Sequence, residues 1–207
     1  GGPLPEQRSE PRTVSEQLAR DADPGVMATA SGRFFGFVIG GTIPAAIAAD
    51  WLTSAWDQNA GLALPAPAAG VVEEVAGAWL KELLGLPGDA SFGFVTGCQM
   101  AHFTCLAAAR HHLLAGVGWE VERDGLSGAP PIRVVAGANR HATRDRALQF
   151  LGMGTASIQE VSSDDQGRML TEALRHELER ADVLLFTDTP TTEIYTGGFD
   201  DLDAAAD

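Results

Sequence analysis

The spacing of hydrophobic positions changes near residue 90 and divides the predicted elements into two groups. Before that point apolar residues recur three or four positions apart, as in the run of Val71, Val75, Trp79 and Leu83. After it, short apolar runs alternate with longer stretches of helical spacing. The pattern predicts a helical N-terminal segment followed by a domain that mixes strands and helices.

Two helices are predicted in the N-terminal segment. Pro44 suits the first turn of a helix that covers residues 44–56. A second helix begins near Val71 and ends at Gly85, a residue type that commonly terminates helices.

The residues before these helices show little apolar periodicity. Residues 1–30 are rich in Pro, Glu, Arg and Asp, and they are predicted to form a flexible tail with one short helix around Val14–Arg20. An apolar run then covers residues 34–39 and ends at the pair Gly40 and Gly41. A buried contact with a second chain would explain this run, and so would a core strand or helix.

From residue 90 onward, predicted strands alternate with predicted helices. Strands are predicted over residues 91–97, 131–137, 156–162 and 182–188, and helices over 99–115, 142–151 and 170–180. This alternation is typical of an α/β domain with a mostly parallel sheet. The predicted organisation is therefore a flexible tail (1–30), a helical segment (31–89) and an α/β domain (90–207).

Composition and charge limit the classes of binding partner that the chain is expected to have. The 207 residues include 14 Lys+Arg and 28 Asp+Glu, which gives a formal net charge of −14. Nucleic acids and anionic membrane surfaces attract basic faces, so neither is an expected partner. No stretch reaches the roughly 18 apolar residues of a membrane helix. The apolar fraction of 45% and charged fraction of 20% are typical of a soluble globular protein.

The cysteines and the single lysine carry further information. Cys98 and Cys105 would lie roughly 10 Å apart along a helix, too far for a disulfide. Reduced thiols are expected, as in a cytoplasmic protein. Lys81 is the only lysine among the 14 basic residues, so chemistry that needs a lysine must use Lys81 or a residue outside this chain.

Two segments could carry chemistry. The strand–turn–helix around Gly97 could bind an anion, because backbone N–H groups and the helix dipole favour a phosphate there. A tight connection without a ligand explains the same pattern and is favoured on this signal alone. His141 follows the strand 131–137, at the sheet edge where parallel sheets bind ligands. It could stack on an aromatic ring or transfer a proton, or equally it could cap a helix next to Thr143.

No metal site is expected. His111, His112 and His176 have no carboxylate or cysteine at ligand spacing, and a solvated helix face explains them better.

The order of several blocks resembles a known family. These blocks are RFFGFVIGGTIPAAIAADWL, PAAGVVEEVAGAWLKELLGLP, GFVTGCQMAHFTCLAAAR, RHATRDRAL and TGGFDDLDAAAD, and the resemblance runs from about Ser31 to Asp207. Together they resemble the group II pyridoxal-phosphate-dependent decarboxylases, most of all a bacterial branch with a T-G-G-Q-M-A-N-F segment. The resemblance implies the large domain of a fold-type-I, aminotransferase-like enzyme, incomplete in this chain.

The resemblance also assigns site residues. Gly97, Cys98 and Gln99 match the turn that binds the phosphate of pyridoxal 5'-phosphate, with Cys98 in place of a usual Gly or Ser. His141 matches the histidine that stacks on the pyridine ring and is the candidate catalytic residue. Thr143 matches a Ser or Thr of the same site.

Other matches and departures are spread along the chain. His102 stands in place of a usual Asn, and Thr191–Glu193 in place of a small Ala-Gly pair. Phe34, Phe35 and the pair Gly40–Gly41 match the N-terminal segment that lines the substrate entrance in the family. Asp200 matches the aspartate of a later block.

Two residues that the family requires are not found in this sequence. The family has an Asp that pairs with the pyridine nitrogen and an Asp-x-His-Lys segment whose lysine forms the Schiff base. Lys81 lies on the helix before the α/β domain and is expected to be an ordinary surface lysine. The chain alone is therefore expected to be inactive.

Three explanations remain for that absence. The chain can be part of a longer enzyme, which is the favoured explanation. It can be one half of a split enzyme that a second chain completes, or a non-catalytic binding or regulatory subunit.

The function implied by the resemblance is decarboxylation of an L-amino acid with pyridoxal 5'-phosphate as cofactor. The enzyme would be a carboxy-lyase acting as a homodimer or with a complementing second chain. The sequence does not identify the amino acid.

Overall fold

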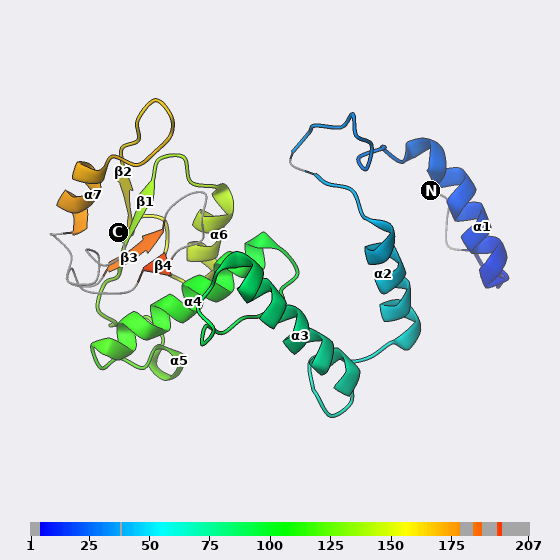
Figure 1. Ribbon diagram of the computed structural model, residues 1–207, viewed down its shortest axis with the longest axis horizontal. Coiled ribbons are helices and arrows are strands. Elements are labelled where there is room, and N and C mark those ends of the chain that lie inside the picture. The colour runs from blue at the N-terminus through cyan, green and yellow to red at the C-terminus, as the bar shows by residue number, and fades with distance from the viewer. Residues whose placement is uncertain (1–4, 38, 179–183, 188–193, 196–207) are drawn as a thin grey trace. The chain divides into compact units, whose positions relative to one another are not determined.

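A computed structural model describes residues 5–37, 39–178, 184–187 and 194–195 of the chain (Figure 1). The chain divides into two units, Gly1–Asp89 and Ala90–Asp207, and each is described separately.

The first unit is helical, and proline begins each of its α-helices. These helices are α1 (Pro11–Ala22), α2 (Pro44–Trp56) and α3 (Pro67–Leu84), with a short 3₁₀ turn, η1 (Asp23–Gly25), after α1. Proline suits this position because its φ is already helical and its missing N–H has no acceptor there. Helix α3 ends at Gly85, whose φ of 67° is the left-handed conformation that terminates helices.

The predicted helices of this unit are confirmed, with changes at their ends. Helix α2 covers the predicted residues, whereas α3 begins four residues before Val71, at Pro67. Helix α1 is longer than the short helix predicted around Val14–Arg20, and an ion pair between Arg12 and Glu16, one turn apart, supports it.

The apolar run before α2 forms neither a strand nor a helix in its described residues. Phe35 and Phe37 each expose 92% of their surface, and Phe37 has a φ of 55° in a turn. A core element therefore does not explain this run.

The second unit contains a four-stranded sheet in the order β2-β1-β3-β4. Its strands are β1 (Arg133–Gly137), β2 (Ile158–Val161), β3 (Leu184–Thr187) and β4 (Ile194–Tyr195). The central strand β1 pairs in parallel with both β2 and β3, so that Val134 lies opposite Ile158 and Leu185. The antiparallel pairing of β3 with β4 was not predicted. The prediction of an α/β domain with a mostly parallel sheet is confirmed.

Four helices accompany the sheet: α4 (Cys98–Gly116), α5 (Val121–Asp124), α6 (Ala142–Phe150) and α7 (Thr171–Leu178). Helices α4 and α6 pack together against β1, and this contact forms the core: Leu106, Ala109, Val134, Ala147, Leu148 and Leu151. Helix α7 contacts β2, and Figure 1 shows it on the opposite side of the strands from α6. This arrangement follows from right-handed crossovers. The connection from β1 to β2 runs in one direction across the sheet, and the connection from β2 to β3 runs back across β1 in the opposite direction, so their helices cover opposite faces.

One predicted strand is wrong. Residues 91–95 form neither a helix nor a strand, residues 96–97 form a bend, and the sheet of the described residues does not include them. The alternating apolar residues of this segment do not suffice to form a strand, because a strand also needs a neighbouring strand with which its backbone forms hydrogen bonds. Phe92 and Phe94 instead pack edge to face, with ring centres 5.8 Å apart.

In the described part of the chain, no helix is both long and apolar enough to cross a membrane.

Candidate cofactor site

The candidate site lies where the first turns of α4 and α6 meet. The two helices belong to the same unit and share the core described above. Side chains of the α4 turn reach residue 143 in α6, which brings together predicted site residues that are 44 positions apart in the sequence.

Gly97 precedes α4 in a conformation that only glycine adopts readily. Its φ of 155° and ψ of 178° lie in a region closed to residues with a side chain. The Gly97 carbonyl accepts hydrogen bonds from the N–H groups of Met100 and Ala101, both at 3.0 Å. A Cβ atom on Gly97 would meet no atom within 4 Å, so the space beside this turn is open.

Two side chains of α4 hold Thr143. Gln99 Nε2 donates to the Thr143 carbonyl at 3.0 Å, and His102 Nδ1 lies 3.0 Å from the Thr143 hydroxyl. The backbone and the hydroxyl of Thr143 are therefore fixed from the same helix.

His141 is the N-cap of α6. Its Nδ1 accepts a hydrogen bond from the Thr143 N–H at 3.2 Å and lies 2.8 Å from the Thr143 hydroxyl. The residue is exposed, so its ring is accessible while one nitrogen is held by the helix turn. The prediction left stacking, proton transfer and helix capping open; capping is present and does not occupy the ring face.

His102 is buried beside two basic groups, and only 9% of its surface is exposed. Burial lowers its pKa from the ordinary value of 6.5, and repulsion from Arg144, and from His141 whenever that ring is protonated, lowers it further. His102 is therefore neutral at physiological pH.

Cys98, which stands in place of the expected Gly or Ser, leaves the N-terminus of α4 accessible. Its thiol lies 3.9 Å from His102 Nε2, so the extra bulk is directed at the His102 ring. The thiols of Cys98 and Cys105 are both free and exposed on α4.

The loop before His141 is held by an arginine. Arg140 pairs with Asp145 of α6 and with Glu160 of β2, each at 2.8 Å. Both partners raise the pKa of Arg140, and its two bonds fix the approach to His141. Sequence reasoning missed this clamp, because only the fold brings Glu160 close to Arg140.

The remaining predicted residues lie outside the described part of the second unit. Phe34, Phe35, Gly40 and Gly41 belong to the first unit. Residues 191–193 and Asp200 lie outside the described residues.

Lys81 also belongs to the first unit. Its Nζ donates to the Gly88 carbonyl at 2.7 Å, beyond the end of α3. It thus contributes to the loop that leaves this helix.

No group of three or more potential metal ligands occurs among the described residues. His111 of the predicted solvated face pairs with Glu122, which lies eleven positions away.

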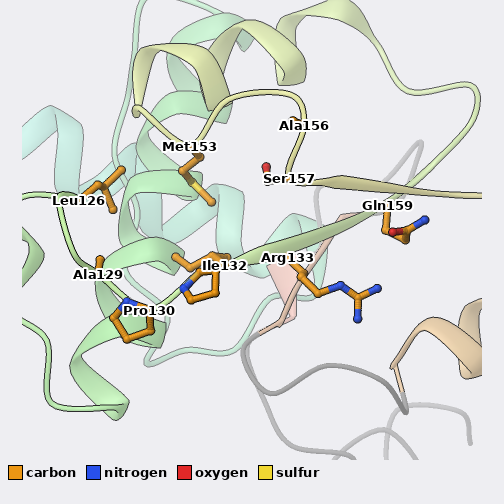
Figure 2. A pocket seen from close by; sticks show the side chains of 10 residues that line it. Leu126, Ala129, Pro130, Ile132, Arg133, Met153, Ala156, Ser157 and Gln159 are labelled. Carbon is orange, nitrogen blue, oxygen red and sulfur yellow. The ribbon is translucent and has the colours of Figure 1, made fainter.

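A cavity of about 360 Å³ lies at the other end of the sheet (Figure 2). Its lining includes Ile132 and Arg133 at the start of β1, Ser157 just before β2, and Met153. Ligands of parallel sheets bind at the carboxyl ends of the strands, whereas this cavity lies at the amino ends and contains none of the predicted site residues.

Known proteins share this fold. The chain aligns with the crystal structure of mouse CSAD in its apo form with a TM-score of 0.81, at 23% identity, over 92% of this chain and 40% of that one. It aligns with Oryza sativa TDC, solved with PLP and tryptamine, with a TM-score of 0.73, at 26% identity, over 86% of this chain and 40% of that one. The neighbours are pyridoxal-phosphate decarboxylases of fold type I, so the predicted fold class is confirmed.

A similar protein of known sequence is also a decarboxylase. An acidic amino acid decarboxylase from Xenopus tropicalis is 27% identical over 203 residues, which cover 95% of this chain and 38% of the relative. The chain therefore spans about two fifths of the length of this relative.

The described residues fit the phosphate of pyridoxal 5'-phosphate. Gly97 leaves open space beside the turn, and the N–H groups of Cys98 and Gln99, which begin α4, have no acceptor within the helix. The dipole of α4 favours an anion at this end. The exposed ring of His141 stands on the neighbouring turn, tied to α4 through Thr143.

The match to the family covers nearly the whole sequence. The description "Pyridoxal-dependent decarboxylase conserved domain" applies to residues 3–207, and the cofactor of this family is pyridoxal 5'-phosphate. The chain thus belongs to the pyridoxal-dependent decarboxylase family.

Proposed function

We propose that this chain is the cofactor-binding part of an enzyme that removes the α-carboxyl group of an L-amino acid. One observation carries the proposal: Gln99 and His102 of α4 hold Thr143, and Thr143 holds His141. The turn suited to a phosphate and the histidine suited to a ring are thus parts of one hydrogen-bonded group.

In this proposal Gly97, Cys98 and Gln99 hold the phosphate through backbone N–H groups. Gly97 permits a close approach because it lacks a Cβ atom. The Gln99 side chain is engaged with Thr143, so its contribution to the phosphate is its backbone.

His141 would lie against the pyridine ring and hold it by stacking. Thr143 and Arg140 orient this residue from two sides, since one binds Nδ1 and the other fixes the preceding loop. When bound, pyridoxal 5'-phosphate supplies an electron sink for the electron pair that remains when CO₂ leaves.

The Schiff-base lysine and the aspartate for the pyridine nitrogen would come from outside these 207 residues. Lys81 is the only lysine of the chain, and its Nζ is bonded to the Gly88 carbonyl. The chain alone is therefore expected not to turn over, and either a longer chain or a second one would complete the enzyme.

Phe35, Gly40 and Gly41 would line the substrate entrance. We limit the substrate to an L-amino acid, because the similar proteins include both an acidic amino acid decarboxylase and a protein solved with tryptamine. We place the enzyme in the cytoplasm and in a bacterial branch of the family.

The active enzyme would be a homodimer. Phe35 and Phe37 expose most of their surface, and so do Trp51 of α2 and Trp79 of α3, which is unfavourable for large apolar side chains in water. A second copy that covers the first unit would bury these side chains.

Replacement of His141 in the complete enzyme tests the proposal. We expect His141→Ala to weaken binding of pyridoxal 5'-phosphate about 10-fold, as loss of a stacked ring does, and to slow decarboxylation, measured by cofactor titration and by CO₂ release. His112→Ala, an exposed histidine on α4, is the matched control and should change neither quantity. Unchanged binding and activity in His141→Ala would remove His141 from the site.

A further inference from the structure

Two histidine rings share one threonine hydroxyl at the start of α6. Thr143 Oγ1 lies 3.0 Å from His102 Nδ1 and 2.8 Å from His141 Nδ1. A hydroxyl carries a single proton, so it donates to one ring and accepts from the other. The direction of these two bonds therefore decides which nitrogen of each ring carries a proton.

A backbone bond sets that direction. The Thr143 N–H donates to His141 Nδ1 at 3.2 Å, which requires a lone pair on this nitrogen. An Nδ1 that accepts has no proton to give, so the Thr143 hydroxyl, 2.8 Å away, donates to the same lone pair, and the ring proton of His141 lies on Nε2. Thr143 Oγ1 is left to accept a proton from His102 Nδ1.

His102 is suited to the donor end of this chain. It is buried and its pKa is lowered, so its ring is neutral and carries one proton. With that proton on Nδ1, the remaining nitrogen Nε2 is an acceptor, and the Cys98 thiol lies 3.9 Å from it. The contacts of the Thr143 hydroxyl with both rings are then satisfied at once.

We propose that His102 is a positioning residue for His141. It acts through the Thr143 hydroxyl, which adds to the Thr143 N–H as a donor to His141 Nδ1, and so holds His141 in a single form with its proton on Nε2, the ring nitrogen that Thr143 does not engage. The inference rests on the proposed function only in that His141 lies against the cofactor. A fixed orientation and tautomer would then present the same ring to the cofactor in every turnover.

Nitrogen-15 NMR of histidine-labelled enzyme measures the tautomers directly. We use the complete enzyme without cofactor and assign His102 and His141 from variants that lack each residue. We expect the proton of His141 on Nε2 and the proton of His102 on Nδ1. The opposite assignment for either ring overturns the inference.

Substitutions at His102 test its role as donor. His102→Leu removes the donor, so the Thr143 hydroxyl can rotate and accept from His141 Nδ1. We expect the tautomer ratio of His141 to change about fivefold, which corresponds to one ordinary hydrogen bond. His102→Asn keeps a donor for the hydroxyl and should preserve the single form. An unchanged ratio in His102→Leu, or a changed ratio in His102→Asn, contradicts the proposal.

A second pair of variants protects the test against misfolding at position 102. Thr143→Val keeps the shape of the side chain but removes the hydroxyl, whereas Thr143→Ser keeps the hydroxyl. Thr143→Val retains only the backbone donor, so we expect its tautomer ratio of His141 to shift away from the Nε2 form, whereas Thr143→Ser should keep the single form. Equal spectra for the two variants would also contradict the proposal.

Failure of this inference differs from failure of the proposed function. The tautomers are measured without cofactor, whereas the place of His141 at the cofactor is tested by titration of His141→Ala. Normal cofactor binding by His141→Ala contradicts the proposed function and leaves the tautomer result intact.

Discussion

Each chemically important residue of the site is held by a specific constraint. Gly97 is fixed by a backbone conformation closed to other residues, Thr143 by two side chains of α4, and His141 by the turn that it caps. These constraints are local, and single substitutions can therefore test them.

The backbone conformation of Gly97 predicts a large effect of a small substitution. Gly97→Ala should cost about 1–3 kcal/mol, because the φ of 155° and ψ of 178° are strained for alanine. If the turn relaxes instead, its N–H groups leave their positions and the cofactor binds more weakly. Thermal unfolding and cofactor titration of the complete enzyme measure these two effects.

Gly93→Ala is the matched control for this prediction. A Cβ atom there also meets nothing within 4 Å, and Gly93 is not among the glycines with positive φ. If Gly93→Ala and Gly97→Ala behave alike, the conformation of Gly97 has no special role.

The buried His102 predicts a pH dependence of stability. Its pKa in the folded protein lies below 6.5, so the unfolded chain binds a proton more readily than the folded protein. Above pH 6.5 His102 is neutral in the folded protein, and its contribution to stability is fully present. The free energy of unfolding then decreases as the pH falls through the pKa of the folded state.

Urea unfolding of wild type and His102→Asn from about pH 7.5 to about pH 5 measures this contribution. We expect the wild type to lose more stability toward acid pH than the variant. Parallel curves would show that His102 titrates alike in the folded and unfolded states.

At the scale of elements, the contact between α4 and α6 supports the site. Leu106 and Ala109 of α4 pack with Ala147 and Leu148 of α6 against Val134 of β1. The helix starts that carry the site are therefore held together by the core beneath them.

Removal of a core side chain from this contact should destabilise the fold. Leu148→Ala should cost about 2–5 kcal/mol, because the side chain is buried and its loss leaves a cavity. Phe150→Ala, on the same helix but 65% exposed, should cost much less. Equal losses in urea unfolding would contradict the assigned core.

Sequence patterns predicted most elements of the second unit. Helices α4 and α6 and the strands β1 and β2 lie close to their expected positions, because their periodicity and helix ends are local properties. The strand expected over residues 91–97 was wrong, since pairing depends on a neighbour that local sequence does not reveal. For the same reason the antiparallel strand β4 was missed.

The site was predictable only in part. The sequence placed Gly97 before a helix and His141 after a strand, and the resemblance joined them to one cofactor. The bonds from Gln99 and His102 to Thr143 connect segments 44 and 41 positions apart, and no local pattern predicts them.

At the scale of the whole molecule, the exposed apolar side chains of the first unit predict association. We expect the complete enzyme to sediment as a dimer at micromolar concentration. Replacement of Phe35 and Phe37 by Ser should shift it toward the monomer, whereas Gln17→Ser, at an exposed polar position of α1, should have little effect. A monomeric wild-type enzyme would contradict the proposed homodimer.

The central claim is that the start of α4 and His141 hold pyridoxal 5'-phosphate together. A crystal structure of the complete enzyme with this cofactor measures the relevant distances directly. We predict phosphate oxygens within hydrogen-bonding distance of the backbone N–H groups at the start of α4, and the His141 ring stacked on the pyridine ring. A cofactor bound elsewhere, or a pyridine ring out of contact with His141, would contradict the claim.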